Sequence, residues 1–142
     1  MQKEIFRDFL GSRGLKKTRE REAVLDEILS FRGHFEPEDL YIRLRKSGSK
    51  ASRASVYRTL HLLVESGLVE RVTRLDKGNV YEHTFGHSHH DHMVCTSCGA
   101  IIEFFSSELE GLQQKVCRQH NFIGTSHILE IQGNCQECEK KR

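Results

Sequence analysis

Residues 52–83 decide the fold of this chain and read SRASVYRTLHLLVESGLVERVTRLDKGNVYEH. In the first half, up to Ser66, the apolar residues recur at helical spacing, and Gly67 is a natural helix terminator. Two runs of alternating apolar and polar residues follow, 68–74 and 79–83, and the letters DKG between them signal a turn. The stretch therefore predicts a helix followed by a β-hairpin.

Upstream of this stretch the sequence predicts three more helices. Residues 3–10 have apolar residues at helical spacing, and a second helix is expected from the N-cap Thr18 to Phe31. Pro37 suits the first turn of a third helix, which breaks around Gly48. Compact helices followed by a hairpin are the layout of a winged helix-turn-helix domain, whose last helix reads DNA.

The N-terminal end of the expected reading helix carries polar and basic side chains. Residues at this end generally meet base edges and phosphates. The cluster consists of Ser52, Arg53, Ser55, Tyr57 and Arg58. In the alternative interpretation Tyr57 belongs to the core and the arginines form a solvated face.

Composition and charge agree with a DNA-binding protein. With 37% hydrophobic and 30% charged residues, the chain is expected to be soluble and globular. It shows no apolar run long enough for a membrane span and no signal-peptide core, so we expect a cytoplasmic protein without a membrane partner. Of the net charge of +2, residues 1–84 supply +4 (17 Lys and Arg against 13 Asp and Glu) and residues 85–142 supply −2 (5 against 7). The mildly basic first part suits a polyanion.

A dense run of metal-ligand chemistry follows the hairpin. Residues 81–98 read YEHTFGHSHHDHMVCTSC and contain five histidines. In an extended strand His90 and His92 would project to one side, whereas His89 and Asp91 would project to the other. One tetrapeptide could therefore seed two metal sites, although a His-rich tract can also be a solvated loop.

The cysteines predict a third site. Four of the five cysteines form two CxxC pairs, which in a reducing compartment indicate structural zinc rather than disulfides. A redox dithiol and an iron–sulfur cluster are the rival interpretations. Cys117 is expected to be a thiol without a ligand role. The paired residues are Cys95, Cys98, Cys135 and Cys138.

The second half predicts a small α/β unit. Residues 92–95, 100–105 and 126–135 have strand character, and residues 106–120 have helical spacing, with Leu109, Leu112 and Val116 expected to face inward. Such a unit is too small for a generous core, so a zinc ion and a partner subunit would both compensate. We expect an α+β protein with a winged-helix domain at 1–84, a hinge about 83–88, and a metal-binding dimerisation domain at 85–142.

Four segments resemble the ferric uptake regulator family in order and spacing. They are GLKKTREREAVL, ASRASVYRTLHLLVESGLVER, HHDHMVCTSCGAIIEF and HILEIQGNCQEC, and the resemblance covers nearly the whole chain. It implies a metal-dependent, homodimeric repressor that binds double-stranded DNA at AT-rich palindromic operators, and not an enzyme.

The resemblance also implies the site residues. The sensing site would consist of His34, Glu82, His90, His92 and Glu103. A second site would consist of His89, Asp91, Glu110 and His127, and structural zinc would lie on the four paired cysteines. The expected DNA contacts are Lys16, Arg19, Ser52, Ser55, Tyr57 and Arg58.

Several of these residues have a simpler interpretation. His34 could cap the second helix, Glu103 could face solvent, and His127 could be a core histidine. Glu110 could form a capping box with Ser107. Relatives commonly have one residue fewer between Glu82 and His90, so His83 could replace or accompany Glu82 as a ligand.

The regulatory metal is expected to be Fe(II), replaceable by Mn(II), Co(II) or Zn(II), because mixed nitrogen and oxygen ligands suit these ions. The zinc-sensing branch of the family tends to use a regulatory cysteine, and no cysteine precedes Cys95. The peroxide-sensing branch has aspartates where this chain has Glu82 and Glu103. Within the family, a zinc-responsive and a peroxide- or manganese-responsive regulator remain alternatives. Outside the family, the alternatives are a metallohydrolase and a zinc-stapled protein-interaction module.

Overall fold

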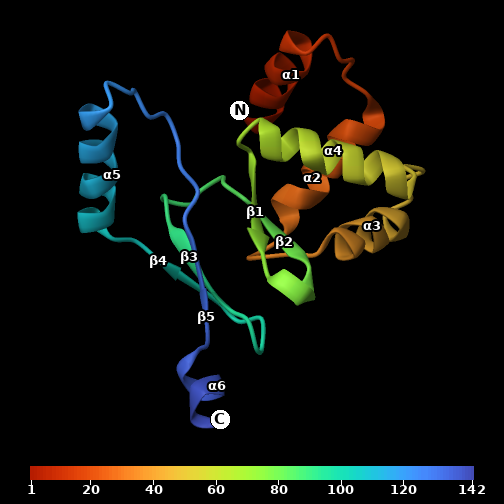
Figure 1. Cartoon of the computed structure of the whole chain (residues 1–142). Coiled ribbons are helices and arrows are strands. Elements are labelled where there is room, and N and C mark those ends of the chain that lie inside the picture. Colours follow the sequence, from red (N-terminus) through yellow and green to blue (C-terminus); the bar gives the residue numbers. More distant parts are fainter. The chain divides into compact units, whose positions relative to one another are not determined.

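The chain folds into two units of helices and short strands (Figure 1). The computed structural model describes residues 1–142, with the exception of the side chain of Asp76. The first unit comprises Met1–Thr73 and Gly78–His87, and the second comprises Arg74–Lys77 and Ser88–Arg142. In chain order the elements are α1 (Gln2–Ser12), α2 (Arg19–Ser30), α3 (Pro37–Lys46), α4 (Arg53–Glu65), β1 (Val69–Thr73), a 3-10 turn (Leu75–Lys77), β2 (Asn79–His83), β3 (Asp91–Cys95), β4 (Ile101–Phe104), α5 (Ser107–Gln119), β5 (Glu130–Gly133) and α6 (Gln136–Lys140).

Local sequence signals account for the helix ends of the first unit. The Thr18 hydroxyl accepts a hydrogen bond from the Arg21 N–H at 3.2 Å and so caps α2. The Ser52 hydroxyl accepts one from the Ser55 N–H at 3.1 Å and caps α4. Pro37 is the first residue of α3, as expected. Gly67 ends α4 with a φ of 80°, a conformation that favours glycine.

The core of the first unit lies between its helices. Helix α2 packs against both α3 and α4, and α4 continues into β1, which packs against it (Figure 1). Burying each large apolar side chain contributes about 1.5–3 kcal/mol, so this cluster supplies most of the unit's stability. Its fully buried members include Val24, Leu25, Ile28, Leu40, Leu44, Val56 and Leu63.

The expected hairpin is present as the antiparallel pair of β1 and β2, in which Glu70 lies opposite Glu82. A 3-10 turn joins the two strands. The chain before α3 adds a short bridge to this wing, because Phe35 and Tyr81 exchange two backbone hydrogen bonds of 2.8 Å. This bridge holds His34 next to the wing.

The second unit is built on a three-stranded sheet with the order β4-β3-β5. The central strand β3 pairs antiparallel with β4 and parallel with β5. Helix α5 lies in the connection from β4 to β5, as parallel pairing requires a crossover. The winged helix-turn-helix followed by a small α/β unit, expected from the sequence, is confirmed.

The second unit departs from the sequence expectations in three respects. The last strand begins only at Glu130, so His127 lies in the loop before it. The short helix α6 at the C-terminal end was not expected. Leu112 and Val116, expected to face inward, are 57% and 53% exposed, because no other element of the described chain covers that side of α5.

None of the described helices combines the length and the apolar character that crossing a membrane requires.

Candidate metal centres and reading helix

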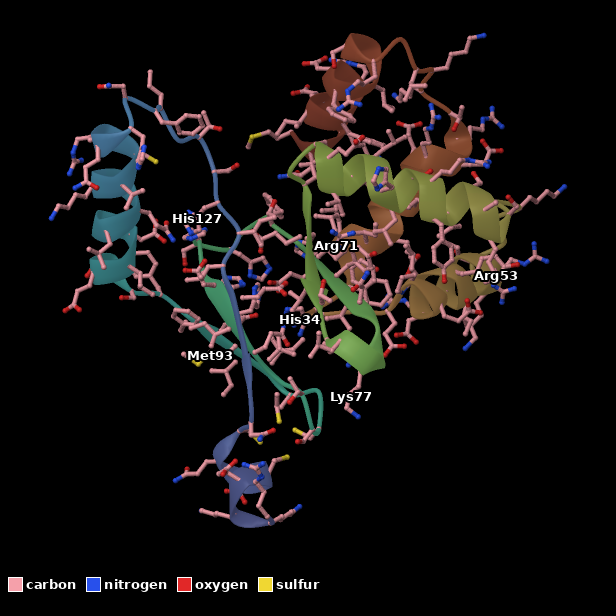
Figure 2. The ribbon with its side chains drawn as sticks, viewed as in Figure 1. His34, Arg53, Arg71, Lys77, Met93 and His127 are labelled. Atoms are coloured by element: carbon pink, nitrogen blue, oxygen red, sulfur yellow. The ribbon has the colours of Figure 1, made fainter. Side chains whose placement is uncertain are left out.

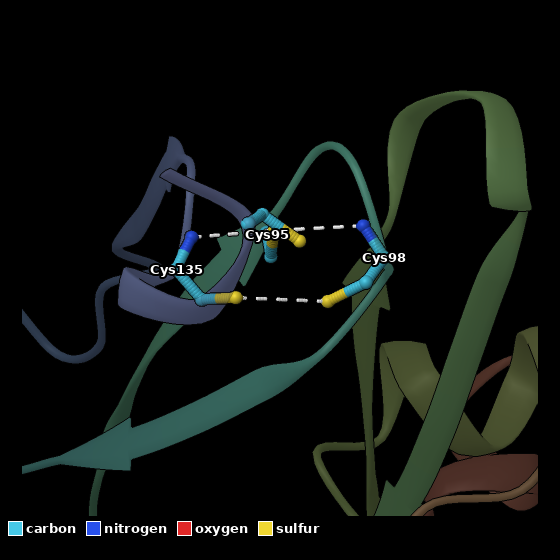
Figure 3. A group of neighbouring side chains, drawn as sticks. Cys95, Cys98 and Cys135 are labelled. Carbon is cyan, nitrogen blue, oxygen red and sulfur yellow. Dashed lines mark hydrogen bonds between the residues drawn. The ribbon is translucent and has the colours of Figure 1, made fainter. Parts of the chain in front are cut away.

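The four paired cysteines converge at one end of the sheet. Figure 3 shows three of them, Cys95, Cys98 and Cys135. Cys95 ends β3, Cys98 lies in the following turn, and Cys135 and Cys138 flank the start of α6. Their sulfur atoms all lie within 4.8 Å of one another, and Cys98 Sγ is 3.8 Å from Cys135 Sγ. Zinc–thiolate bonds of about 2.3 Å at tetrahedral angles would separate two sulfurs by about 3.8 Å. The donor set therefore fits a structural zinc ion.

Backbone groups prepare the first thiolate of this centre. The N–H groups of Cys135 and Cys98 point to Cys95 Sγ at 3.3 and 3.5 Å. These contacts lower the pKa of the Cys95 thiol to about 6. Contacts with the thiols of Cys135 and Cys98 raise the pKa of the Cys138 thiol to about 12. Binding of a cation at this cluster is therefore coupled to the loss of thiol protons.

Polar side chains tie the two cysteine turns together. The Ser97 hydroxyl donates to Asn134 Oδ1 at 2.8 Å, and the Thr96 hydroxyl contacts the same oxygen at 3.4 Å. The Thr96 N–H also donates to the Gly133 carbonyl at 2.7 Å. The turns are therefore joined by hydrogen bonds in addition to any metal.

A second cluster lies at the other end of β3, where His89, Asp91, Glu110 and His127 meet. The Nε2 atoms of His89 and His127 are 3.0 Å apart. Asp91 Oδ1 lies 3.5 Å from the first and 3.2 Å from the second. Glu110 Oε1 lies 3.0 and 3.3 Å from the same two atoms. The cluster draws on the strand, on α5 and on the loop before β5, where Figure 2 labels His127.

These distances fit a four-coordinate cation. Bonds of about 2.0–2.1 Å at tetrahedral angles separate donor atoms by about 3.3–3.4 Å, close to the five distances of 3.0–3.5 Å found here. Asp91 is 2% exposed, and its second oxygen has no hydrogen-bond partner among the described residues. A buried carboxylate beside two imidazoles fits a metal better than it fits a packed core.

The alternatives proposed for two members of this cluster are wrong. The cap of α5 is Ser106, whose hydroxyl accepts from the Leu109 N–H at 3.3 Å, so Glu110 does not pair with Ser107 in a capping box. His127 is not a core histidine of a strand, because its side chain remains 27% exposed and faces Asp91.

The first unit presents a histidine and a carboxylate of the expected sensing set. His34 Nε2 lies 3.4 Å from Glu82 Oε1, and Glu82 is 2% exposed. The His83 ring instead contacts the Phe31 carbonyl at 3.1 Å. Glu82, and not His83, therefore lies beside His34. Glu70 was not expected among these residues, but its carboxylate lies within 4.8 Å of that of Glu82. The pairing of Glu70 with Glu82 across the predicted hairpin could have indicated it.

The second unit presents the remaining members. The His90 and His92 rings are 4.9 Å apart, and His90 Nε2 is 3.6 Å from Glu103 Oε1. His90 Nδ1 donates to the Ser88 carbonyl at 3.1 Å, so Nε2 is the ring nitrogen that could act as a metal ligand. Strand register places His92 between Glu103 and Glu130, so a second unexpected carboxylate flanks this buried imidazole.

The expected DNA contacts lie on the first unit. Lys16 and Arg19 are exposed before and at the start of α2. At the start of α4 the Ser52 hydroxyl is used for capping, whereas Arg58 is exposed and Tyr57 is 45% exposed. Val56, the residue before Tyr57, is fully buried and anchors this end of the helix. Tyr57 is thus outside the core, contrary to the alternative interpretation.

Comparison with known proteins gives a consistent result. The ferric uptake regulator family model matches residues 12–132. A ferric uptake regulation protein of Campylobacter upsaliensis is 36% identical over 97% of this chain and 89% of its own length. The Helicobacter pylori ferric uptake regulator, whose structure is described as having three functional metal-binding sites, has a TM-score of 0.74 at 30% identity, covering 98% of this chain and 94% of its own. A Pseudomonas aeruginosa ferric uptake regulator with manganese has a TM-score of 0.74 at 32% identity, covering 89% and 95%.

A winged helix-turn-helix joined to a unit with clustered metal donors defines a metal-responsive DNA-binding regulator. The chain belongs to the ferric uptake regulator family.

Replacing Cys135 with Ser should remove about one zinc ion per chain, because three thiolates no longer complete the tetrahedral site. Metal analysis of the purified variant measures the loss. Cys117→Ser is the matched control, since Cys117 lies on α5 outside the cluster, and it should keep the full zinc content. Equal zinc in both variants would exclude the four-cysteine centre.

Glu110→Gln should abolish one tetrahedral Co(II) site, because it removes one of the four donors around His89 and His127. Titration with Co(II), followed by visible absorption, measures the number of sites in the zinc-loaded protein. Glu108→Gln removes an exposed carboxylate from the same helix and should leave the titration unchanged. The second site is disproved if both variants bind as much Co(II) as the unmodified chain.

Proposed function

We propose that this protein is an Fe(II)-responsive repressor of iron-uptake genes, acting in the cytoplasm on AT-rich palindromic operators. The observation that carries the proposal is the mixed donor set of the sensing residues: each unit contributes a histidine beside a carboxylate, His34 with Glu82 and His90 with Glu103. Imidazole and carboxylate ligands suit Fe(II), Mn(II) and Co(II), and Zn(II) can also occupy such a set. The names of the relatives support iron, and the manganese-bound relative supports replacement by Mn(II).

The regulatory ligands of this proposal are His34 and Glu82 from the first unit and His90, His92 and Glu103 from the second. The carboxylates in each unit's share of these ligands gather negative charge, which favours binding of a cation. Glu70 and Glu82 are directly opposed on the wing, and like charges opposed across a strand pair are destabilising. His92 lies between two carboxylates in the sheet. A bound divalent cation would offset these charges and favour the conformation in which all its ligands can reach it.

DNA recognition is assigned to the exposed end of α4 and to the start of α2. Ser55, Tyr57 and Arg58 would meet bases and phosphates in the major groove, with Ser52 at the helix end. Lys16 and Arg19 would approach the backbone and the minor groove, whose potential is most negative in AT-rich DNA.

A homodimer is part of the proposal because the second unit leaves a large apolar face uncovered. Met93, labelled in Figure 2, lies between Ile102 and Ile131 in the strand register. All three side chains are at least 38% exposed. Leu112 and Val116 of α5 are further exposed apolar side chains of the same unit, and water disfavours such exposure. A second copy would cover it, and a two-fold dimer would present two reading helices to a palindromic operator.

Sedimentation of the zinc-loaded protein should give twice the chain mass at micromolar concentration. Met93→Glu should shift the boundary toward the monomer, since it places a charge in the middle of the apolar row. Ile42→Glu, at an exposed position of α3, is the control and should remain dimeric. A monomeric unmodified chain would overturn this part of the proposal.

Two other functions are less well supported. A hydrolase zinc ion keeps an open coordination position for water, whereas the cysteine cluster and the His89 cluster each supply four protein donors. A zinc-stapled interaction module would not need the basic reading end of α4. Regulation therefore accounts for more of the chain than either alternative.

His90→Ala should abolish metal-dependent DNA binding without unfolding the protein, because it removes a regulatory ligand and no part of the core. We would measure DNA binding by gel shift with Fe(II), Mn(II) and Zn(II) in turn, under anaerobic conditions. The probe is the palindromic duplex that the unmodified chain enriches from a random library. Fe(II) is expected to act at the lowest concentration.

His120→Ala, which changes an exposed histidine at the end of α5, is the matched control and should retain the metal response. The proposal fails if the unmodified protein binds DNA equally well with and without metal, or if His90→Ala keeps the response.

A further inference from the structure

Arg53, the first residue of α4, is held by residues of α3. Its Nε donates to Glu38 Oε2 at 3.1 Å, and its Nη2 donates to Glu38 Oε1 at 2.5 Å. The guanidinium also lies 4.4 Å from the centre of the Tyr41 ring. Figure 2 labels Arg53 at the end of α4, next to α3. One edge of the guanidinium is therefore occupied by a carboxylate, and one face by an aromatic ring.

The pair is fully charged at neutral pH. The hydrogen bond from Arg53 lowers the pKa of the Glu38 carboxyl, and the same bond raises the pKa of Arg53. A cation in the first turn of a helix is disfavoured by the helix dipole, and the first turn of α4 contains no acidic residue. Glu38 thus supplies from α3 the negative charge that α4 lacks.

The position of this pair matters for DNA binding. Arg53 adjoins Ser55, Tyr57 and Arg58 at the N-terminal end of α4, and a phosphate that approached its Nε–Nη2 edge would have to displace Glu38. A bidentate carboxylate and a phosphate compete for one arginine fork. Contacts to phosphate add affinity for every sequence and carry no sequence information directly.

We propose that Glu38 withholds Arg53 from DNA phosphates and so determines how well the protein distinguishes its operator from other DNA. The inference rests on the proposed DNA-binding function. With Arg53 neutralised, the reading end of α4 has one phosphate contact fewer on all DNA, and base contacts make up a larger share of the binding free energy. Glu38 is thus a specificity-determining residue that itself touches no DNA.

Glu38→Gln tests this inference, because it removes the charge and keeps the shape. Affinity for a mixed-sequence duplex should rise severalfold, and affinity for the enriched palindrome should rise less than that for the mixed sequence. The slope of log affinity against log salt should steepen by about 0.9 for each bound chain, the value for one more phosphate contact. Both duplexes are measured over a salt series with the metal-loaded protein.

Two further variants separate this role from a structural one. Arg53→Gln should leave the salt slope of the unmodified chain unchanged, and Glu38→Gln with Arg53→Gln should return to that slope. Glu27→Gln is the matched control: it frees Arg43 from a similar ion pair of 2.8 Å between α2 and α3, with the same change in net charge. It should not change the discrimination between the two duplexes.

Different outcomes would overturn different statements. A flatter salt slope in Arg53→Gln alone would mean that Arg53 already binds phosphate in the unmodified chain. An unchanged salt slope in Glu38→Gln would mean that the ion pair only stabilises the fold. Either result refutes this inference while the unmodified protein still binds DNA with metal. An unmodified protein that fails to bind DNA refutes the proposed function itself.

Discussion

The alternation of side chains along β3 is the constraint on which the second unit depends. Successive residues of a strand point to opposite faces, and this five-residue strand supplies donors to every metal cluster of its unit. Asp91 joins the His89 cluster, His92 lies between two carboxylates, and Cys95 belongs to the thiolate cluster. Met93, facing the other way from His92, lies in the exposed apolar row. A one-residue slip of the strand would exchange these faces and destroy all of these arrangements together.

Metal donors take the place of a core in this unit. Its apolar side chains are largely exposed, and its buried residues include Asp91 and His92 beside Val94 and Cys95. Buried acids and imidazoles cost free energy unless a partner offsets their charge, and the donor geometry fits cations that would do so. The first unit, in contrast, has a continuous apolar cluster and is stabilised mainly by the burial of those side chains. Metal binding should therefore affect the order of the second unit more than that of the first.

The helices and the hairpin could be predicted because their periodicity is local. The two CxxC pairs indicated the thiolate cluster directly, whereas only the resemblance to the family grouped Glu110 and His127 with His89 and Asp91. The inward face expected for Leu112 and Val116 was wrong, since spacing reveals an apolar face but not whether its own chain covers it. Nor could sequence decide between Glu82 and His83. The backbone bridge from Phe35 to Tyr81, which brings His34 beside Glu82, joins residues far apart in the chain.

The most direct test of metal-dependent DNA recognition is the affinity of the zinc-loaded protein for Mn(II) or Fe(II), measured with and without the enriched palindromic duplex. Coupling between two binding sites is reciprocal, so DNA must raise the affinity for metal by the factor by which metal raises the affinity for DNA. We expect a common factor of about 5–150, the usual range for such coupling. An affinity for metal that is the same with and without DNA would contradict a regulatory role for the sensing residues.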